Sequence, residues 1–163
     1  MRTIEISTPI QELTFEELND IDKELVKQAQ EATFRSYVPY SKFHVGAAIL
    51  LGNGKIVAGS NQENAAYPTG LCAERTAAFY ASSANPGESF KKIAIAARNE
   101  TDKKVDWEKG FQAFPISPCG GCRQALLEYE NLYGDIEVIL YGREKIYIVP
   151  SIKALLPLGF TEF

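Results

Sequence analysis

The sequence predicts an α/β fold: a three-layer α-β-α sandwich in which helices cover both faces of one mixed five-stranded sheet. Helix-like and strand-like patterns alternate along the 163 residues, in the order helix, two strands, helix, strand, helix, two strands. The stretch from Lys92 to Arg98 has an apolar interior, as is typical of a central strand buried between two layers of helices. No repeat or linker divides the chain, so we expect one domain over 1–163, with an N-terminal arm at 1–13.

The first helix is expected to run from Thr14 to about Ser36, with a break near Asn19-Asp20 as an alternative. Thr14 and Glu17 have the spacing of a capping box, in which two side chains satisfy free N–H groups at a helix start. Pro39 follows the predicted end. The apolar residues of this segment recur at helical spacing: Leu18, Ile21, Leu25, Ala29 and Ala32.

The remaining elements are bounded by turn residues and helix breakers. Gly52-Asn53-Gly54 separates two strand-like runs and predicts a hairpin. Pro86-Gly87 ends the second helix, and Pro118 precedes the third. The expected elements are, in chain order, strands 43–51 and 55–60, a helix at 71–83, a strand at 92–98, a helix at 119–131, strands 136–141 and 145–149, and a helical turn at 152–156.

Composition and charge limit the classes of function. The net charge is −4 and the pI is about 5.1, and no cluster of Lys and Arg provides the basic surface that nucleic-acid binding requires. No apolar run approaches the roughly 20 residues of a membrane span. The first 12 residues lack the apolar core of a secretory signal, so we expect a cytoplasmic protein that acts on a small molecule.

Three cysteines indicate a metal site. Cys119 and Cys122 form a Cys-x-x-Cys pair, and Cys72 lies at the start of another predicted helix. Helix N-termini carry free N–H groups and partial positive charge, which favour the thiolates that bind metal. Two cysteines three positions apart face the same way on a first helical turn, and a third can close on the same point. Three sulfur ligands suit one Zn²⁺ ion in a tetrahedral site.

The number of ligands favours a catalytic zinc over a structural one. A structural zinc is usually closed by four protein ligands, whereas a catalytic zinc keeps one position for water. Glu74 is two residues after Cys72, where its carboxylate can lean over that position and take the proton of the water. Arg75 is expected to donate hydrogen bonds to the cysteine sulfurs from behind the metal.

Three other interpretations of the cysteines stay open at this point. The three thiols can be buried core residues without a metal. Cys119 and Cys122 can be a thioredoxin-like redox pair, although this leaves Cys72 and Glu74 unexplained. His44, the only histidine, can complete a structural zinc site, but a lone histidine on a strand is more often a packing or surface residue.

The motifs together resemble the small cytidine deaminases that bind zinc. The resemblance covers most of the chain, from about Ser36 to Phe160, and rests on five blocks in order rather than on one short motif. These blocks are Tyr40-Ser41-Lys42-Phe43-x-Val45-Gly46-Ala47-Ala48, Asn61-x-Glu63-Asn64-Ala65-Ala66-Tyr67, Cys72-Ala73-Glu74-Arg75-Thr76, Ser117-Pro118-Cys119-Gly120-x-Cys122-Arg123-Gln124 and Leu155-Leu156-Pro157.

The resemblance implies hydrolytic deamination of cytidine and deoxycytidine to uridine and deoxyuridine in pyrimidine salvage, on a cytidine deaminase-like fold. Water activated by zinc attacks C4 of the pyrimidine, and Glu74 carries a proton to ring N3 and later to the leaving amino group. The residues that match Asn61 and Glu63 bind the ribose 3′-hydroxyl. Ala73 gives the base a backbone contact, and Phe43 packs on the pyrimidine ring.

The resemblance also implies a homotetramer in which subunits share their sites. Tyr67 and Phe160 match residues that approach a site from a neighbouring subunit. From the residues alone, Phe43 and Phe160 would be core aromatics, and a turn-forming Asn61 with a solvated Glu63 would be the favoured interpretation.

Two segments depart from the family pattern. In the arm 1–13, Ile4 and Ile6 alternate with polar residues, so an edge strand is expected there. The segment 99–114 is long and polar, with Trp107, Phe111 and Phe114 as its expected anchors, and leads into the third helix. Because segment 99–114 leads into the third helix, it leaves the substrate less defined than the reaction type. An alternative to cytidine deamination is deamination of a modified cytosine nucleoside or a nucleoside antibiotic. A zinc-stabilised scaffold without catalysis is a further alternative.

Overall fold

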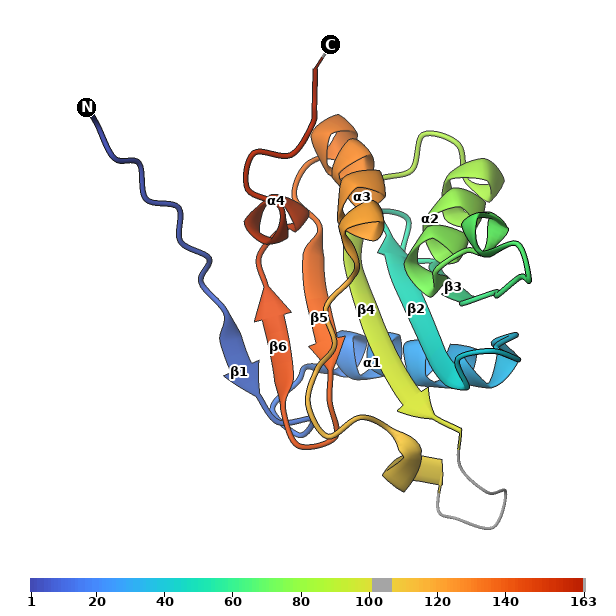
Figure 1. Cartoon of the computed structure of the whole chain (residues 1–163). Helices are drawn as coiled ribbons and strands as arrows, with labels where there is room; N and C mark the ends of the chain where they lie inside the picture. The colour runs from blue at the N-terminus through green and yellow to red at the C-terminus, as the bar shows by residue number, and fades with distance from the viewer. Residues whose placement is uncertain (101–106, 163) are drawn as a thin grey trace.

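A single sheet of six strands runs through the molecule. The computed structural model describes residues 1–100 and 107–162. The strand order is β1-β6-β5-β4-β2-β3 (Figure 1). All neighbouring strands are antiparallel except β4 and β5, which are parallel, so the sheet is mixed as the sequence predicted. The strands are β1 Gln11–Leu13, β2 Phe43–Leu51, β3 Ile56–Ser60, β4 Phe90–Asn99, β5 Glu137–Tyr141 and β6 Ile146–Val149.

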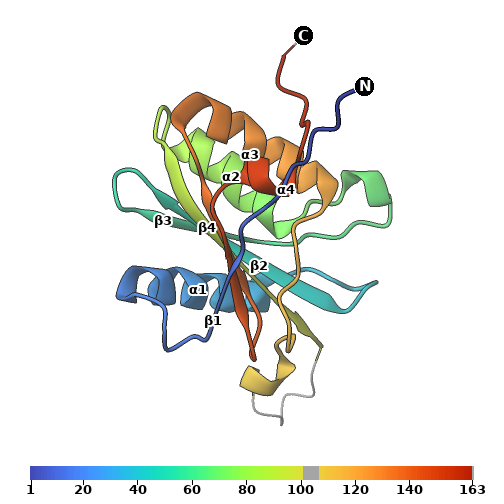
Figure 2. The ribbon, with the colours of Figure 1, turned by 90° about the vertical axis from the view of Figure 1, so that its left-hand side faces the viewer.

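Helices cover both faces of this sheet, which confirms the three-layer α-β-α sandwich. One face is covered by α1, and the other by α2, α3 and α4 (Figure 2). Within the described residues, no helix is both long and apolar enough to cross a membrane. The helices are α1 Asp20–Ala32, α2 Ala73–Ala84, α3 Gly120–Tyr133 and α4 Ile152–Leu155, with single 3-10 turns η1 at Thr33–Arg35, η2 at Tyr67–Thr69 and η3 at Trp107–Gly110.

The prediction of five strands was wrong by one, because β1 adds to the sheet from the N-terminal arm. β1 pairs with the edge strand β6, and Glu12 forms an ion pair with Lys145 at 2.8 Å. A three-residue strand is too short to show an alternating pattern, so its pairing partner decides where it forms. Ile4 and Ile6, the residues that predicted an edge strand, lie outside β1 with exposed side chains.

The predicted start of the first helix was also wrong. Thr14 and Glu17 do interact, and the Thr14 N–H donates to Glu17 Oε2 at 2.7 Å, but they close a turn outside the helix. Asn19 is the actual N-cap, since its Oδ1 accepts the N–H of Asp22 at 2.9 Å. The capping-box pattern therefore found a local hydrogen bond, and the stronger cap lies five residues downstream.

The core consists of two apolar layers, one on each face of the sheet. On β4, Ile93 and Ile95 belong to the layer under α2 and α3, whereas Ala94 and Ala96 belong to the layer under α1. The small residues let α1 approach closely, and a side chain at Gly46 of β2 would collide with the α1 backbone. This alternation fixes which face of the sheet each side chain of β2 and β4 can reach.

The segment after β4 is anchored by fewer aromatic residues than predicted. Phe111 is buried and packs edge-on against Tyr141, with ring centroids 5.6 Å apart. Phe114 is 57% exposed, so its prediction as an anchor was wrong. The Trp107 side chain and residues 101–106 lie outside the part of the structure that is described.

Candidate metal centre and adjoining cleft

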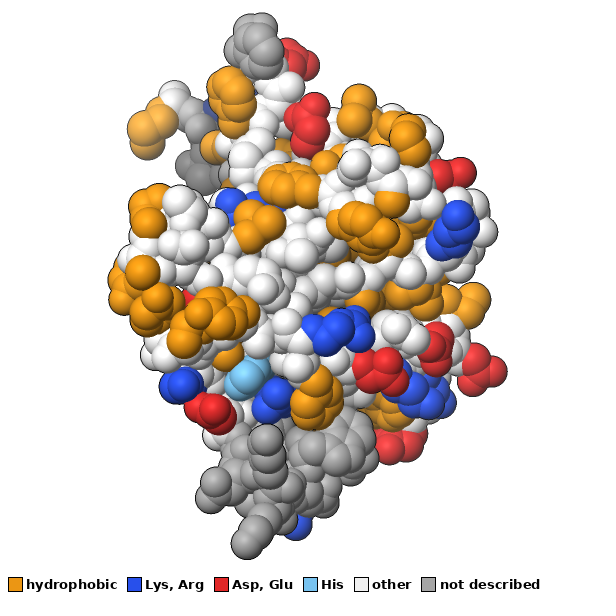
Figure 3. All heavy atoms as spheres, turned by 90° about the vertical axis from the view of Figure 1, so that its right-hand side faces the viewer, with side chains coloured by type: hydrophobic (Ala, Val, Ile, Leu, Met, Phe, Trp, Pro, Cys, Tyr) orange, Lys and Arg blue, Asp and Glu red, His pale blue; other side chains and the backbone are white. Residues whose placement is uncertain are grey.

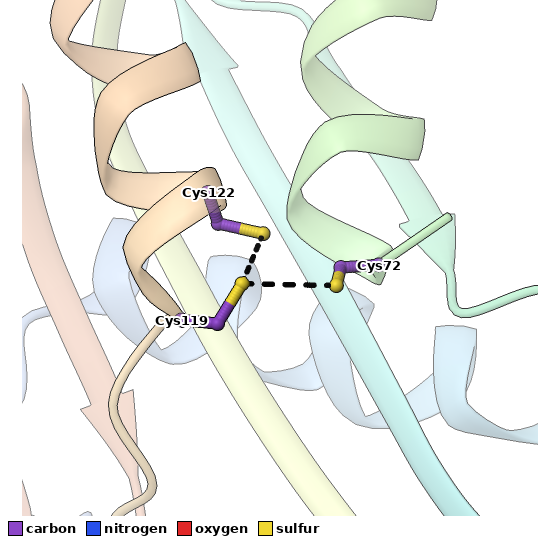
Figure 4. Close-up of side chains that lie close together, drawn as sticks. All are labelled: Cys72, Cys119 and Cys122. Carbon is purple, nitrogen blue, oxygen red and sulfur yellow. Dashed lines mark hydrogen bonds between the residues drawn. The ribbon is translucent and has the colours of Figure 1, made fainter. Parts of the chain in front are cut away.

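The three cysteines, far apart in sequence, converge between the first turns of α2 and α3 (Figure 4). Sγ of Cys119 lies 3.9 Å from Sγ of Cys72 and 3.5 Å from Sγ of Cys122. All three sulfurs lie within 4.8 Å of one another, and none is in a disulfide. Among the described residues, these cysteines are the one group able to share a metal ion.

The sulfur spacing fits a zinc ion. A Zn–S bond is about 2.3 Å, so two sulfurs at corners of one tetrahedron lie about 3.8 Å apart. The two measured separations, 3.5 and 3.9 Å, lie on either side of this value. The donors are three thiols, the ligand type that zinc prefers. The cluster therefore fits one tetrahedral ion with three of its four positions taken by protein.

Both helices present their N-termini to the cluster, as the sequence predicted. Cys72 is the N-cap of α2, and Cys119 is the N-cap of α3; both have extended backbones, and neither side chain caps its helix. Cys122 lies in the first turn of α3 and is buried. The unpaired N–H groups and the helix dipoles place partial positive charge beside the sulfurs.

In the protein without metal, one of the three cysteines, Cys72, already favours the thiolate form. Hydrogen bonding from the Cys122 side chain, followed by that from Arg75, lowers the pKa of Cys72 to about 5. The pKa of Cys122 is raised, because its thiol donates to Cys72 and is buried. Nη2 of Arg75 lies 3.6 Å from Cys72 Sγ, and this contact raises the pKa of the guanidinium.

Glu74 is a buried carboxyl next to the cluster. It occupies the first turn of α2 and is only 5% exposed. Burial raises its pKa, and the negative charge of Cys72 adds to the effect, whereas hydrogen bonding with Cys122 opposes it. A carboxyl with a raised pKa can both hold and release a proton near neutral pH, which is the requirement for general acid–base work.

The position of α2 depends on a close approach to β3. A Cβ at Gly59 would lie 2.5 Å from the backbone N of Ala77 and 3.0 Å from the carbonyl O of Ala73. Only glycine allows this approach without displacing the helix. Ala73 directly follows Cys72. The contact with Gly59 therefore fixes how closely the first turn of α2, with Cys72 and Glu74, lies against the sheet.

A cleft of about 570 Å³ opens beside the cluster. This volume lies within the usual range of sites for small molecules. The cleft is bordered by Cys72 and by four of the residues that the sequence placed in substrate binding or behind the metal. The lining residues are Tyr40, Ser41, Asn61, Gln62, Glu63, Asn64, Tyr67, Gly70, Leu71, Cys72 and Arg75.

Asn61 and Glu63 are held by backbone contacts at the cleft. Asn61 Oδ1 accepts the N–H of Val45 at 2.9 Å, and its Nδ2 donates to the carbonyl of Phe43 at 2.9 Å. Glu63 Oε2 accepts the N–H groups of Tyr40 and Ser41 at 3.0 and 3.2 Å. Hydrogen bonds from Ser41 lower the pKa of Glu63, so the carboxylate stays charged at the mouth of the cleft.

The other four residues predicted to contact the substrate differ in burial and in their distance from the cleft. Phe43 begins β2 and Ala73 is buried in the first turn of α2, and neither is among the residues that line the cleft. Tyr67 is 75% exposed and packs edge-on against Tyr40, with ring centroids 5.9 Å apart. Phe160 is 66% exposed and does not line the cleft of its own chain. The monomer thus brings Tyr67 to the cleft but not Phe160.

His44 is not part of the metal centre. It pairs across the sheet with Arg98, on the face of β2 that Gly46 presents to α1. The cysteines lie on the opposite face, under α2 and α3. The interpretation of a structural zinc completed by His44 is therefore wrong, because the alternation of β2 directs this side chain to the other layer.

Sequence reasoning missed Tyr40 and Ser41 as parts of the site. Both line the cleft, and their backbone N–H groups hold Glu63. The sequence feature that could have indicated them is their position at the start of the first motif block, which also contains Phe43. Chain spacing alone could not assign them to the cleft, because the loop reaches Glu63 from more than 20 residues away.

Comparisons with known proteins agree with this chemistry. A family model described as "Cytidine and deoxycytidylate deaminase zinc-binding region" matches residues 19–133, more than half of the chain. A cytidine deaminase of Sporosarcina psychrophila is 42% identical over 143 residues, which cover 88% of this chain and 93% of the relative. The crystal structure of a cytidine deaminase from Burkholderia pseudomallei matches with a TM-score of 0.67 and 38% identity, covering 84% of this chain and 97% of that one. A blasticidin-S deaminase of Bacillus cereus is 30% identical over 141 residues, which cover 86% of this chain and 93% of the relative.

Proposed function

Because this chain belongs to the cytidine and deoxycytidylate deaminase family, we propose that it deaminates cytidine and deoxycytidine by hydrolysis, forming uridine and deoxyuridine in pyrimidine salvage. The observation that carries the proposal is the buried carboxyl of Glu74 beside three converging thiols and an open cleft. Cys72, Cys119 and Cys122 would hold one zinc ion. When bound, zinc supplies Lewis-acid chemistry that makes water a nucleophile at neutral pH.

Glu74 is the proton carrier in this proposal. The reaction adds water across C4 and N3 of the cytosine ring and then releases ammonia, so one proton must reach N3 and another must reach the amino nitrogen. A carboxyl whose pKa is raised by burial can take up and return these protons. Arg75 would donate to the sulfur of Cys72 and support it as a metal ligand.

The cleft residues would orient the nucleoside. Asn61 uses one side-chain N–H and one lone pair for backbone contacts, which leaves one donor and one acceptor position for the ribose 3′-hydroxyl. Glu63 offers the second acceptor. The base would lie between the ring of Phe43 and the backbone of Ala73, next to Glu74.

We propose a homotetramer in which the sites are shared between subunits. Tyr67 and Phe160 are largely exposed in the single chain, which suits residues that contact another subunit. Figure 3 shows orange hydrophobic side chains spread over the face beside α2 and β3. Exposed large aromatic residues belonging to η1, α2 and the adjoining loops support the same arrangement; they are Phe34, Tyr37, Tyr40, Phe79 and Tyr80.

A second candidate function is deamination of a modified cytosine nucleoside or a nucleoside antibiotic. It is favoured by the similarity to the blasticidin-S deaminase of Bacillus cereus. A cytoplasmic location and the absence of nucleic-acid substrates are part of the main proposal. Three reduced cysteines support the first, and the net charge of −4 supports the second.

Metal analysis combined with ammonia release tests the proposal. We expect one zinc per chain and release of ammonia from both cytidine and deoxycytidine. The same assay run with blasticidin S separates the two candidate functions. Negligible turnover of cytidine with rapid turnover of blasticidin S would replace the main proposal by the second one, and zinc without any turnover would support a scaffold.

A further inference from the structure

The end of the chain is held against α3 by one side chain. Gln124 Nε2 donates to the carbonyl O of Phe160 at 2.7 Å, and the N–H of Phe160 donates back to Gln124 Oε1 at 3.2 Å. The amide thus pairs with both backbone groups of one residue, as a neighbouring strand would. It grips the backbone of Phe160 and leaves the ring 66% exposed.

The same segment is tied down at two further points. Arg123, the neighbour of Gln124, donates from Nη1 to the carbonyl O of Leu155 at 2.6 Å and from Nε to that of Pro118 at 2.8 Å. Gly159 lies so close to Leu127 of α3 that a side chain there would collide with it. We call residues 155–160 the C-terminal strap.

The strap also contains an unfavourable backbone conformation. Leu158 has a φ of 57°, in the left-handed region that a leucine rarely adopts, and its side chain is 94% exposed. Such a conformation is unfavourable and persists only where surrounding contacts impose it. The contacts of the strap therefore fix its backbone, although neither Leu158 nor Phe160 is buried in return.

We propose that Gln124 is a positioning residue for catalysis, which fixes the backbone of Phe160 so that its ring reaches the substrate cleft of a neighbouring subunit. This inference rests on the proposed function and its shared site. It accounts for a side-chain amide and a strained leucine backbone that together fix a residue that is 66% exposed in the single chain. It also gives Gln124, two residues after the ligand Cys122, a role apart from the metal.

A purely structural role predicts something different. If Gln124 only secures the chain end, its loss should speed local opening without changing how substrate binds. If it acts through Phe160, its loss should weaken substrate binding only while Phe160 is present. Mutational effects of two residues that act through one contact are not additive, and a double-mutant cycle detects this.

The experiment uses the full-length enzyme and the variants Gln124→Met, Phe160→Ala and their combination. Met keeps the length of the side chain and removes both hydrogen bonds. Glu128→Gln, at an exposed position one turn further along α3, is the matched control. Measurements are KM and kcat for cytidine, and hydrogen exchange of the Phe160 amide, which is bonded in the wild type.

We expect Gln124→Met to raise KM by roughly three- to tenfold, the effect of one or two neutral hydrogen bonds, with kcat changed less than about twofold. Exchange at Phe160 should become faster, and the combined variant should match Phe160→Ala alone. The control should behave as wild type. An unchanged KM in Gln124→Met, or full additivity with Phe160→Ala, overturns the inference while leaving the proposed function intact. A wild type that does not turn over cytidine refutes the proposed function, and the inference falls with it.

Discussion

Nη2 of Arg75 lies 3.6 Å from Sγ of Cys72, so a cation in the first turn of α2 contacts the sulfur of the N-cap residue of the same helix. Together with Cys122, this contact keeps Cys72 deprotonated in the protein without metal. The thiolate is the form that binds zinc. We therefore propose that Arg75, next to the larger effect of Cys122, favours the metal-binding form of Cys72 in the metal-free protein.

We predict that Arg75→Gln raises the pKa of Cys72 from its value of about 5, because the charged donor is lost. Thiolate absorbance followed against pH in metal-free protein measures this pKa. Arg35→Gln, at an exposed position of η1, is the control and should leave the titration unchanged. An identical titration in Arg75→Gln would mean that Cys122 alone sets the acidity of Cys72.

Glu74→Gln should abolish most of the deaminase activity while the metal is retained. Glutamine fills the same space but cannot carry a proton, and loss of a general acid–base group costs about 10²- to 10⁴-fold in rate. Ammonia release, zinc content and circular dichroism are measured together. Glu31→Gln, on the exposed side of α1, is the control. Activity near that of wild type in Glu74→Gln would require another proton carrier.

His44 should make stability depend on pH. Desolvation by burial lowers its pKa below 6.5, and Arg98 and Lys42 act in the same direction against Glu100. As pH falls, His44 therefore becomes protonated at a higher pH in the unfolded chain than in the folded one. The free energy of unfolding decreases from about pH 6.5 down to the folded-state pKa of His44. His44 is the only histidine, so its ring resonances in NMR give that pKa directly.

His44→Gln supplies the matched test of this dependence. Urea midpoints at several pH values should decrease less for the variant than for wild type over the same window, since glutamine does not titrate. A folded-state pKa of 6.5 or above in the NMR titration would contradict the prediction.

Gly59→Ala should weaken both the fold and the metal centre. The new methyl group would lie 2.5 Å from the N of Ala77, so α2 must move away from β3. Such overpacking costs about 1–3 kcal/mol. Urea denaturation and zinc affinity are the measurements. Gly121→Ala is the control, because a Cβ at Gly121 meets no atom within 4 Å, and both properties should stay at the wild-type level there.

Glu130→Ala should destabilise the protein without involving the site directly. This carboxylate is 1% exposed and accepts the backbone N–H groups of Ile136, Ile152 and Lys153 at 2.6–2.9 Å. Leaving these groups unpaired costs about 3 kcal/mol, which lowers Tm by about 6–12 °C. Glu128→Ala, exposed on the same helix, should leave Tm unchanged. A Tm decrease of less than about 2 °C for Glu130→Ala would show that water replaces the carboxylate.

Local sequence predicted the elements that carry the site. Cys72 and Cys119 were expected at helix starts, and both are N-caps. The β2 boundaries matched, and those of α3 differed by one or two residues. Helix starts and strand boundaries depend on neighbouring residues and on turn-forming or helix-breaking residues, which can be recognised in the sequence. The start of α1 was misplaced because two capping patterns lie within six residues of each other.

The sequence alone determined the ligand types, the carboxyl of Glu74 and the helix starts that favour thiolates, because these follow from residue identity and short spacing. Only the tertiary structure decided that β1 joins the sheet, that His44 faces away from the cysteines, that Glu130 caps α4 and that Gln124 holds Phe160. These contacts join residues distant in sequence, in several cases through backbone groups common to every residue. Backbone groups leave no trace in the pattern of side chains, so such contacts become visible only when the chain is folded.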